Sequence, residues 1–434
     1  MKITSKIKKQ LSKDRKFIFK LIWTSTTRSV AVIGTLLFKF ILARKLGLQE
    51  FGDFMLVYAM LIGLSFFAKF GIQQAVLRFA GIFMANKDFG KLKSLRRDVI
   101  LFITGTSIFL GILFILFRVI IVDKFFDNNT FTKVILIMAV SLPFYVNIGI
   151  QASYMRAFKK PEIAPLFEVG LSAFYTVALV SIASWLGYNI TPLIVSIFFL
   201  ISVLITSFLG SRILVGILKK LNTEKTIEYK SYSGVFNTLP DYALSSITTY
   251  LIKFSPTIIL GIYASSSDVG LYSIANSTAL VINFVLGIVS SVSAPYFANY
   301  YKEGKIKELK NLIRNSTIYM MVIATPVFLL IIIFPTEILS YFGQEYKQAS
   351  MALVILAVAQ LFNVLTGPVY FVLGMTGHEK QLRNIVFGTA LLSISSSFIL
   401  IPMYGFVGAT ISTAIGLVIQ NFFAYFKTKK ILTI

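Results

Sequence analysis

The sequence predicts an all-α protein that crosses a membrane twelve times, and three observations support this. The chain has 434 residues, of which 56% are hydrophobic and only 14% are charged, and its mean hydropathy is +0.80. Soluble domains carry about 25% charged residues, so this composition is typical of a membrane protein with many spans. Apolar stretches of about 20 residues, the length that crosses a bilayer, recur along the chain. Basic residues are concentrated in alternate connecting loops.

Twelve segments of the chain are apolar over a length that spans a membrane as a helix. They lie at residues 18–42, 54–82, 98–122, 132–156, 163–186, 191–215, 236–262, 270–297, 311–334, 349–374, 382–401 and 405–427. The longest polar connector, residues 216–234, divides them into two groups of six. We therefore expect an N-terminal lobe at residues 1–215, which begins with a basic interfacial segment, and a C-terminal lobe at residues 235–434.

The two lobes are predicted to be related by an internal repeat. Gly52, which follows the first apolar segment, matches Gly270 at a shift of about 218 residues, half of the chain. Gly187 matches Gly405 at the same shift, and an aromatic residue follows each of them. Repeated halves are a common plan of membrane transporters, so the pattern favours a two-lobed transporter.

The formal net charge of +24 raises the question of a nucleic-acid partner, but the placement of the charges argues against one. Most Lys and Arg residues lie near the two termini and in every second connecting loop. The other loops contain only Arg44, Lys45, Lys124, Lys133 and Lys347. This asymmetry follows the positive-inside rule and predicts that both termini are cytoplasmic. The basic face would then contact the anionic headgroups of membrane lipids, and no nucleic acid is expected as a partner.

The sequence patterns of common enzymes are missing. The chain has no cysteine and a single histidine, His378, so it offers no cluster of metal ligands. It has no glycine-rich phosphate-binding loop, no paired carboxylates and no nucleophile elbow. We therefore predict no catalytic residue, no metal and no cofactor, and a transporter rather than an enzyme.

The first apolar segment contains two cations, Arg28 and Lys39, which are eleven residues apart and so point to the same side of a helix. Arg28 would lie about 15 Å deep, near the middle of the membrane. An arginine that faces lipid there costs at least about 2.5 kcal/mol. We therefore expect Arg28 to face protein or a water-filled cavity. The alternatives are an internal salt bridge for Arg28 and, for Lys39, a side chain that extends to the outer headgroups.

Two further segments carry polar residues at helical spacing. In the second segment, Lys69 and Gln73 share a face, and Gly71 between them is expected to bend the helix. In the seventh segment, Lys253 continues a polar face, and Asp241 lies near the inner end. The buried cations outnumber the two intramembrane acids, Asp241 and Glu168, of which Glu168 is a candidate partner for a basic residue. An anionic substrate that contains pyrophosphate or an acidic sugar would supply the missing counter-charge.

Three motifs carry a resemblance to a known family. They are Ala43-Arg44-x-Leu46-Gly47-x-x-x-Phe51-Gly52-x-Phe54, the stretch Phe70–Phe79 that ends the second segment, and Val269–Ala275 at the start of the second half. Together they resemble the bacterial polysaccharide-biosynthesis flippases, the exporters of O-antigen and capsule repeat units. These belong to the multidrug/oligosaccharidyl-lipid/polysaccharide (MOP) superfamily. The resemblance extends over essentially the whole chain.

The resemblance implies a V-shaped, MATE-like pair of six-helix lobes around a cationic cavity in the bacterial cytoplasmic (inner) membrane. Such a protein moves an undecaprenyl-pyrophosphate-linked oligosaccharide to the outer leaflet by alternating access, and the polymerase and chain-length machinery of the pathway are its expected partners. The predicted substrate-binding residues are Arg28, Lys69, Lys253, Lys39, Gln73 and Asp241. The family commonly has an acidic residue near position 253, where this chain has lysine, so the driving force stays open.

Two other functions are compatible with a polytopic membrane protein. A multidrug or cation exporter of the same superfamily needs buried acids, and only Asp241 and Glu168 qualify. A membrane polymerase or ligase needs a sizeable outer loop with catalytic groups, and the predicted outer loops are short. The sequence therefore favours the flippase.

Overall fold

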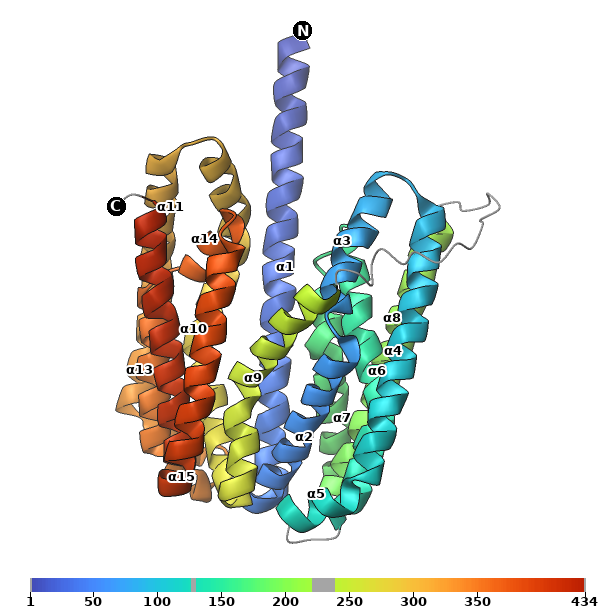
Figure 1. The fold of residues 1–434 in the computed structure, drawn as a ribbon, viewed down its shortest axis with the longest axis vertical. Helices are drawn as coiled ribbons and strands as arrows, with labels where there is room; N and C mark the ends of the chain where they lie inside the picture. The colour runs from blue at the N-terminus through green and yellow to red at the C-terminus, as the bar shows by residue number, and fades with distance from the viewer. Residues whose placement is uncertain (1, 126–129, 221–238, 433–434) are drawn as a thin grey trace.

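The computed structural model describes residues 2–125, 130–220 and 239–432, and within them the secondary structure is entirely helical (Figure 1). Nine helices in this part of the chain are long and apolar enough to cross a membrane. The chain is therefore an all-α, multi-pass membrane protein. The count of twelve spans is not confirmed, because several predicted segments are divided or joined in the structure.

Two helical bundles stand side by side, with α1 between them (Figure 1). The first half contains α1 (Lys2–Leu46), α2 (Leu48–Lys69), α3 (Ile72–Ala85), α4 (Phe89–Leu116), α5 (Arg118–Phe125), α6 (Thr130–Ala157), a π-helical turn η1 (Leu166–Gly170), α7 (Leu171–Trp185) and α8 (Pro192–Lys220). The second half contains α9 (Leu239–Tyr263), α10 (Ser266–Lys302), α11 (Ile306–Ile333), α12 (Pro335–Ser340), a 3₁₀ turn η3 (Gln344–Ala349), α13 (Ser350–Leu365), α14 (Val369–Met375) and α15 (Glu379–Ile431).

The structure differs from the predicted boundaries at both ends of the first half. The basic residues that were expected to form a separate interfacial segment continue the first span as one helix, α1. At the other end, α8 continues to Lys220, beyond the predicted end at residue 215. Most of the predicted linker, from residue 221 onward, lies outside the described residues, so the lobe boundaries stay a prediction.

The second predicted segment is divided in two. α2 ends at Lys69, Phe70 and Gly71 both have left-handed backbone angles (φ 39° and 77°), and α3 begins at Ile72. Gly71 is required for a second reason, because a Cβ at this position would lie 2.5 Å from the backbone nitrogen of Ala243 in α9. Instead of the expected bend, the helix is interrupted at Gly71, and this interruption leaves space for the first turns of α9. In contrast, α15 runs through two predicted segments, with a kink at Gly405.

The repeated glycines form the contact between α2 and α10. A Cβ on Gly52 would lie 1.8 Å from the carbonyl oxygen of Ser266, and a Cβ on Gly270 would lie 2.8 Å from the carbonyl oxygen of Leu48. Gly52 thus faces Ser266, one helical turn before Gly270, and Gly270 faces Leu48, one helical turn before Gly52. This reciprocal contact is what two halves related by a two-fold axis would give. Ser266 also donates a hydrogen bond to the carboxylate of Asp53. The contact lies at the end of the molecule opposite the N-terminus (Figure 1).

The close approach of α2 and α10 gives a direct test. Gly52→Ala places a methyl group against backbone atoms that cannot rotate away, so it should destabilise the protein by about 1–3 kcal/mol. Gly105→Ala is the matched control, because it is also in a membrane-spanning helix but has no atom within 4 Å of its Cβ position. The control should be neutral or stabilising. Melting temperatures of the purified proteins in detergent compare the two, and equal values would contradict the predicted tight contact.

Candidate substrate-binding cluster

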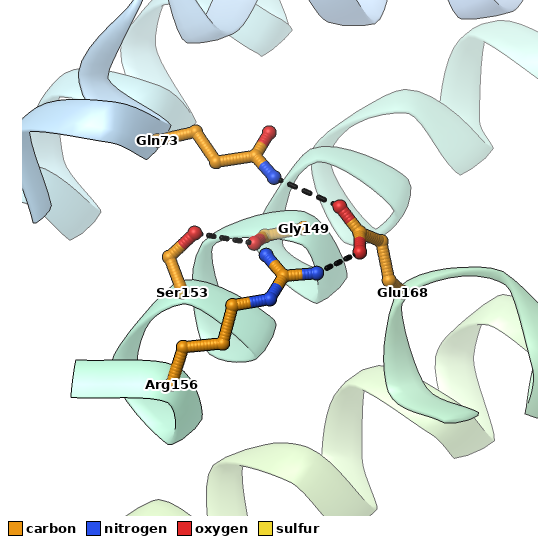
Figure 2. Close-up of polar contacts among 5 residues, drawn as sticks. All are labelled: Gln73, Gly149, Ser153, Arg156 and Glu168. Carbon is orange, nitrogen blue, oxygen red and sulfur yellow. Dashed lines mark hydrogen bonds and ion pairs between the residues drawn. The ribbon is translucent and has the colours of Figure 1, made fainter. Parts of the chain in front are cut away.

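The carboxylate of Glu168 is the centre of a polar cluster in the first half of the chain (Figure 2). Gln73 of α3 donates a hydrogen bond from Nε2 to Glu168 Oε1 at 3.0 Å. Arg156, in the last turn of α6, forms an ion pair with Oε2 of the same carboxylate. Glu168 lies in η1, the π-helical turn that precedes α7. Three separate elements therefore meet at one acidic side chain.

Lys69 lies next to this cluster. Its ammonium group is 5.3 Å from the ring centre of Phe66 and 5.8 Å from that of Tyr145, distances at which aromatic rings stabilise a cation. Gly149 of α6 leaves room for the lysine, since a Cβ there would be 3.2 Å from Lys69 Nζ. Glu168 lies within Coulombic range, but no carboxylate among the described residues forms an ion pair with Lys69. Within the described part of the chain, Lys69 is thus held near the cluster without a paired counter-ion.

Arg28 of α1 and Lys253 of α9 bring two more cations to the same region. Lys253 lies within Coulombic range of both Glu168 and Arg28, so these charges share one neighbourhood. Arg28 Nη2 is 3.6 Å from the position that a Cβ would occupy on Gly287 of α10, so the guanidinium lies against a helix of the second half. The side chains of Arg28 and Lys253 are both exposed in the protein. The expectation that Arg28 faces a water-filled space stays a prediction.

α9 connects this region to α3 through two hydrogen bonds between side chains. Gln74 Nε2 donates to Ser246 Oγ at 3.2 Å, and Arg78 Nη1 donates to the hydroxyl of Tyr242 at 3.4 Å. Both acceptors lie on α9, on the polar face that leads to Lys253. The Phe70–Gly71 break thus has a structural consequence, because it lets α3 follow α9 closely.

The structure brings together four of the six predicted binding residues: Arg28, Lys69, Gln73 and Lys253. Lys39 lies on the same side of α1 as Arg28, as predicted, but three turns away, where it donates a hydrogen bond to Ser277 of α10. The side chain of Asp241 is outside what the structure describes. That any of the six residues binds a substrate stays a prediction. The described residues include no group of three His, Cys, Asp or Glu side chains that could hold a metal ion.

Two members of the cluster are new relative to the sequence-based prediction. Arg156 lies at the end of the predicted span 132–156, and the sequence did not single it out. It is the basic partner that was expected for Glu168, and only the return of the chain through η1 makes the two meet. Tyr145 contacts Lys69, although aromatic residues in a membrane helix ordinarily indicate contact with lipid. No local pattern distinguishes this tyrosine from those that face lipid.

Family models identify the protein class. The model of the polysaccharide biosynthesis proteins matches residues 19–301, and the MatE model matches residues 242–399. The first match includes well over half of the chain, so the chain belongs to the polysaccharide biosynthesis protein family. The resemblance seen in the sequence motifs is thereby confirmed.

Two archaeal proteins are similar in sequence. The probable low-salt glycan biosynthesis flippase Agl15 of Haloferax volcanii is 28% identical over 210 residues, which is 47% of this chain and 44% of that protein. The match thus covers less than half the length of this relative. The uncharacterized membrane protein MJ1068 of Methanocaldococcus jannaschii is 24% identical over 382 residues, covering 84% of this chain and 75% of that protein.

Solved structures of a flippase and of a multidrug transporter share the fold. The lipid II flippase MurJ in an inward closed conformation has a TM-score of 0.72 at 15% identity, over 95% of this chain and 87% of that chain. An inward-facing multidrug resistance transporter of the MATE family has a TM-score of 0.67 at 14% identity, over 94% of both chains. At such identities the likeness establishes the architecture alone, which is that of a MATE-like membrane transporter.

The ion pair of Glu168 gives a second test. Glu168→Gln leaves the Arg156 guanidinium partly buried without its counter-charge, so the protein should lose about 1–3 kcal/mol of stability. Glu303→Gln is the matched control, because it removes the partner of Lys305 from an exposed ion pair. Melting temperatures should fall by several degrees for the first variant and stay unchanged for the second. An unchanged melting temperature for Glu168→Gln would show that the pair does not stabilise the fold.

Proposed function

We propose that this protein is a flippase of surface-polysaccharide synthesis, such as that of O-antigen or capsule. Its substrate would be an undecaprenyl-pyrophosphate-linked oligosaccharide repeat unit, moved from the cytoplasmic to the outer leaflet of a bacterial inner membrane. The observation that carries the proposal is that Lys69 and Lys253 both lie within Coulombic range of Glu168, and that Arg28 lies within the same range of Lys253. These cations come from three helices, and the side chains of Arg28 and Lys253 are exposed at the protein surface.

The chemistry of these cations suits a pyrophosphate. A guanidinium binds two phosphate oxygens at once, and an ammonium group adds a strong charge-assisted hydrogen bond. Glu168 is already engaged by Arg156 and Gln73, so it neutralises only part of the positive charge. A bound diphosphate would supply the remaining negative charge. The residues of the cluster recognise the charged part of the substrate, and they do not select the sugar sequence or the isoprenoid chain.

The arrangement of the helices supports entry from the N-terminal side. The Gly52–Gly270 contact holds α2 against α10 at the far end, whereas the two bundles diverge toward the end that carries the N-terminus (Figure 1). By the positive-inside rule, that end is cytoplasmic. A lipid-linked precursor made in the cytoplasm would then reach the cations directly. Transport would require the far contact to separate and the near end to close, which is alternating access.

The relatives favour glycan transport over drug export. The haloarchaeal relative is named a probable glycan biosynthesis flippase, and a lipid II flippase shares the fold. MATE-type multidrug transporters share the fold as well, so the architecture alone does not decide. The charge favours glycan transport, because an exporter of cationic drugs would have to place its substrate beside Arg28, Lys69 and Lys253, where like charges repel it.

The cluster predicts a graded effect of substitutions at Arg28. Arg28→Ala should abolish the translocation of the lipid-linked oligosaccharide at a normal protein level, and Arg28→Lys should retain part of it, because charge is kept while bidentate geometry is lost. Lys347→Ala is the matched control, since it removes an exposed cation from η3, away from the cluster. Complementation of a deletion strain, with surface polysaccharide and membrane protein both quantified, measures the three variants. Full activity of Arg28→Ala would exclude Arg28 from the site.

A further inference from the structure

Residues 342–346, which we call the strap, extend from the second half of the chain onto the first. The strap lies between α12 and α13. The ring of Phe342 meets Phe40 of α1 edge-on, with 5.3 Å between the ring centres. The ring of Tyr346 meets Phe51 of α2 in the same way, at 6.1 Å. Edge-to-face aromatic pairs attract each other beyond the area that they bury, so the strap is held against both of the first two helices.

A third contact of the strap caps α2. This helix begins at Leu48, and its N-cap residue, Gly47, has no side chain that could bond the free N–H groups of the first turn. Instead, the backbone N–H of Leu48 donates a hydrogen bond to Glu345 Oε2 at 3.3 Å. A carboxylate at this position also complements the positive end of the helix dipole. The N-terminus of α2 thus receives its capping group from the other half of the chain.

The internal repeat shows that this cap is particular to α2. In α10, the equivalent helix, Ser265 stands in the place of Gly47 and caps its own helix. The Ser265 hydroxyl accepts a hydrogen bond from the N–H of Asp268, and the Asp268 carboxylate accepts one from the N–H of Ser265. Such a capping box needs no residue from another element. The cap that Glu345 provides across the two halves is therefore a specific feature of the strap.

One group in the strap opposes the closed arrangement. Tyr346 is 1% exposed, and within the described residues its hydroxyl has no hydrogen-bond partner. A buried hydroxyl without a partner costs free energy that contact with water would return. Gly343 brings Tyr346 to this place through backbone angles (φ 151°, ψ 154°) that are essentially restricted to glycine. Three contacts hold the strap down and one unpaired hydroxyl favours its release, which is the balance expected of a part that opens.

We propose that the strap is a latch that keeps the two halves together at the end opposite the N-terminus. Its contacts join Phe40, Leu48 and Phe51 of the first half to the second half. Leu48 and Phe51 lie within about one helical turn of Gly52, so the latch reinforces the Gly52–Gly270 contact. When the two halves separate at this end, the strap lifts from α1 and α2. Such a latch presupposes the alternating access of the proposed function, but it depends on no property of the substrate.

Thiol labelling tests the latch, because the chain has no cysteine and an introduced one is its only thiol. Ser273→Cys is the reporter, since Ser273 is 5% exposed and lies on α10 about one turn beyond Gly270, toward the middle of the membrane. Intact spheroplasts receive a membrane-impermeant maleimide, and the labelling rate is measured. Glu345→Ala and Phe342→Ala should each raise the rate about three- to tenfold, because each removes one contact of the latch. Tyr346→Phe keeps the ring and removes the unpaired hydroxyl, so it should not raise the rate.

Two controls separate opening from unfolding. Glu337→Ala removes an exposed carboxylate of α12 that, within the described residues, forms no bond with the first half, so the labelling of Ser273→Cys should stay unchanged. Ser196→Cys places the thiol at a fully buried position in α8, where the strap variants should not speed its labelling. The parent rate in either alanine variant of the strap, or equal acceleration at Ser196→Cys, would overturn the proposal. Labelling needs no substrate, so its result is independent of the translocation measured for Arg28→Ala, which tests the proposed substrate site.

Discussion

The close contact of α2 with α10 is the constraint on which the rest of the structure depends. Gly52 and Gly270 allow two backbones to approach where any side chain would collide with a carbonyl oxygen. With the two halves joined there, α1 and α9 are held along the division between the bundles. Lys253 thereby reaches the neighbourhood of Glu168, and Arg28 that of Lys253, from different helices. The charge cluster is thus a product of helix packing, and its opening and closing would follow the separation of the same contact.

Much of the fold could be predicted from the sequence, because membrane spans are defined by local apolar length and the repeat by local motifs. The all-helical architecture and the equivalence of Gly52 and Gly270 are of this kind. The break at Phe70–Gly71 was predicted only as a bend, since the approach of α9 to Gly71 decides its size. The sequence did not predict that α1 is one continuous helix. A basic amphipathic segment has the same sequence pattern whether it lies on the membrane surface or extends a membrane-spanning helix.

The candidate site could be predicted in part. Arg28, Lys69 and Lys253 were selected because an uncompensated cation at membrane depth is costly wherever it lies. These residues lie on three helices, one of which is far from the others in the sequence. Residue spacing within a helix cannot predict that they lie near one another. The pairing of Arg156 with Glu168 was out of reach for the same reason, because the turn η1 returns the chain to α6. Residues on one side of a helix do not necessarily meet in one site. Lys39 lies on the same side of α1 as Arg28, as predicted, yet it donates a hydrogen bond to Ser277 and does not reach the cluster.

The most direct test of the central claim is the fate of lipid-linked glycan in cells that lack this protein. Intact spheroplasts of the deletion strain are treated with a membrane-impermeant probe, and the lipids are then extracted, so that labelled and unlabelled pyrophosphate-linked oligosaccharide report the amount in each membrane leaflet. If the cation cluster serves glycan transport, complete repeat units will accumulate in the cytoplasmic leaflet while surface polysaccharide is lost. Unchanged surface polysaccharide, together with a raised sensitivity to cationic drugs, would contradict the account and favour an exporter.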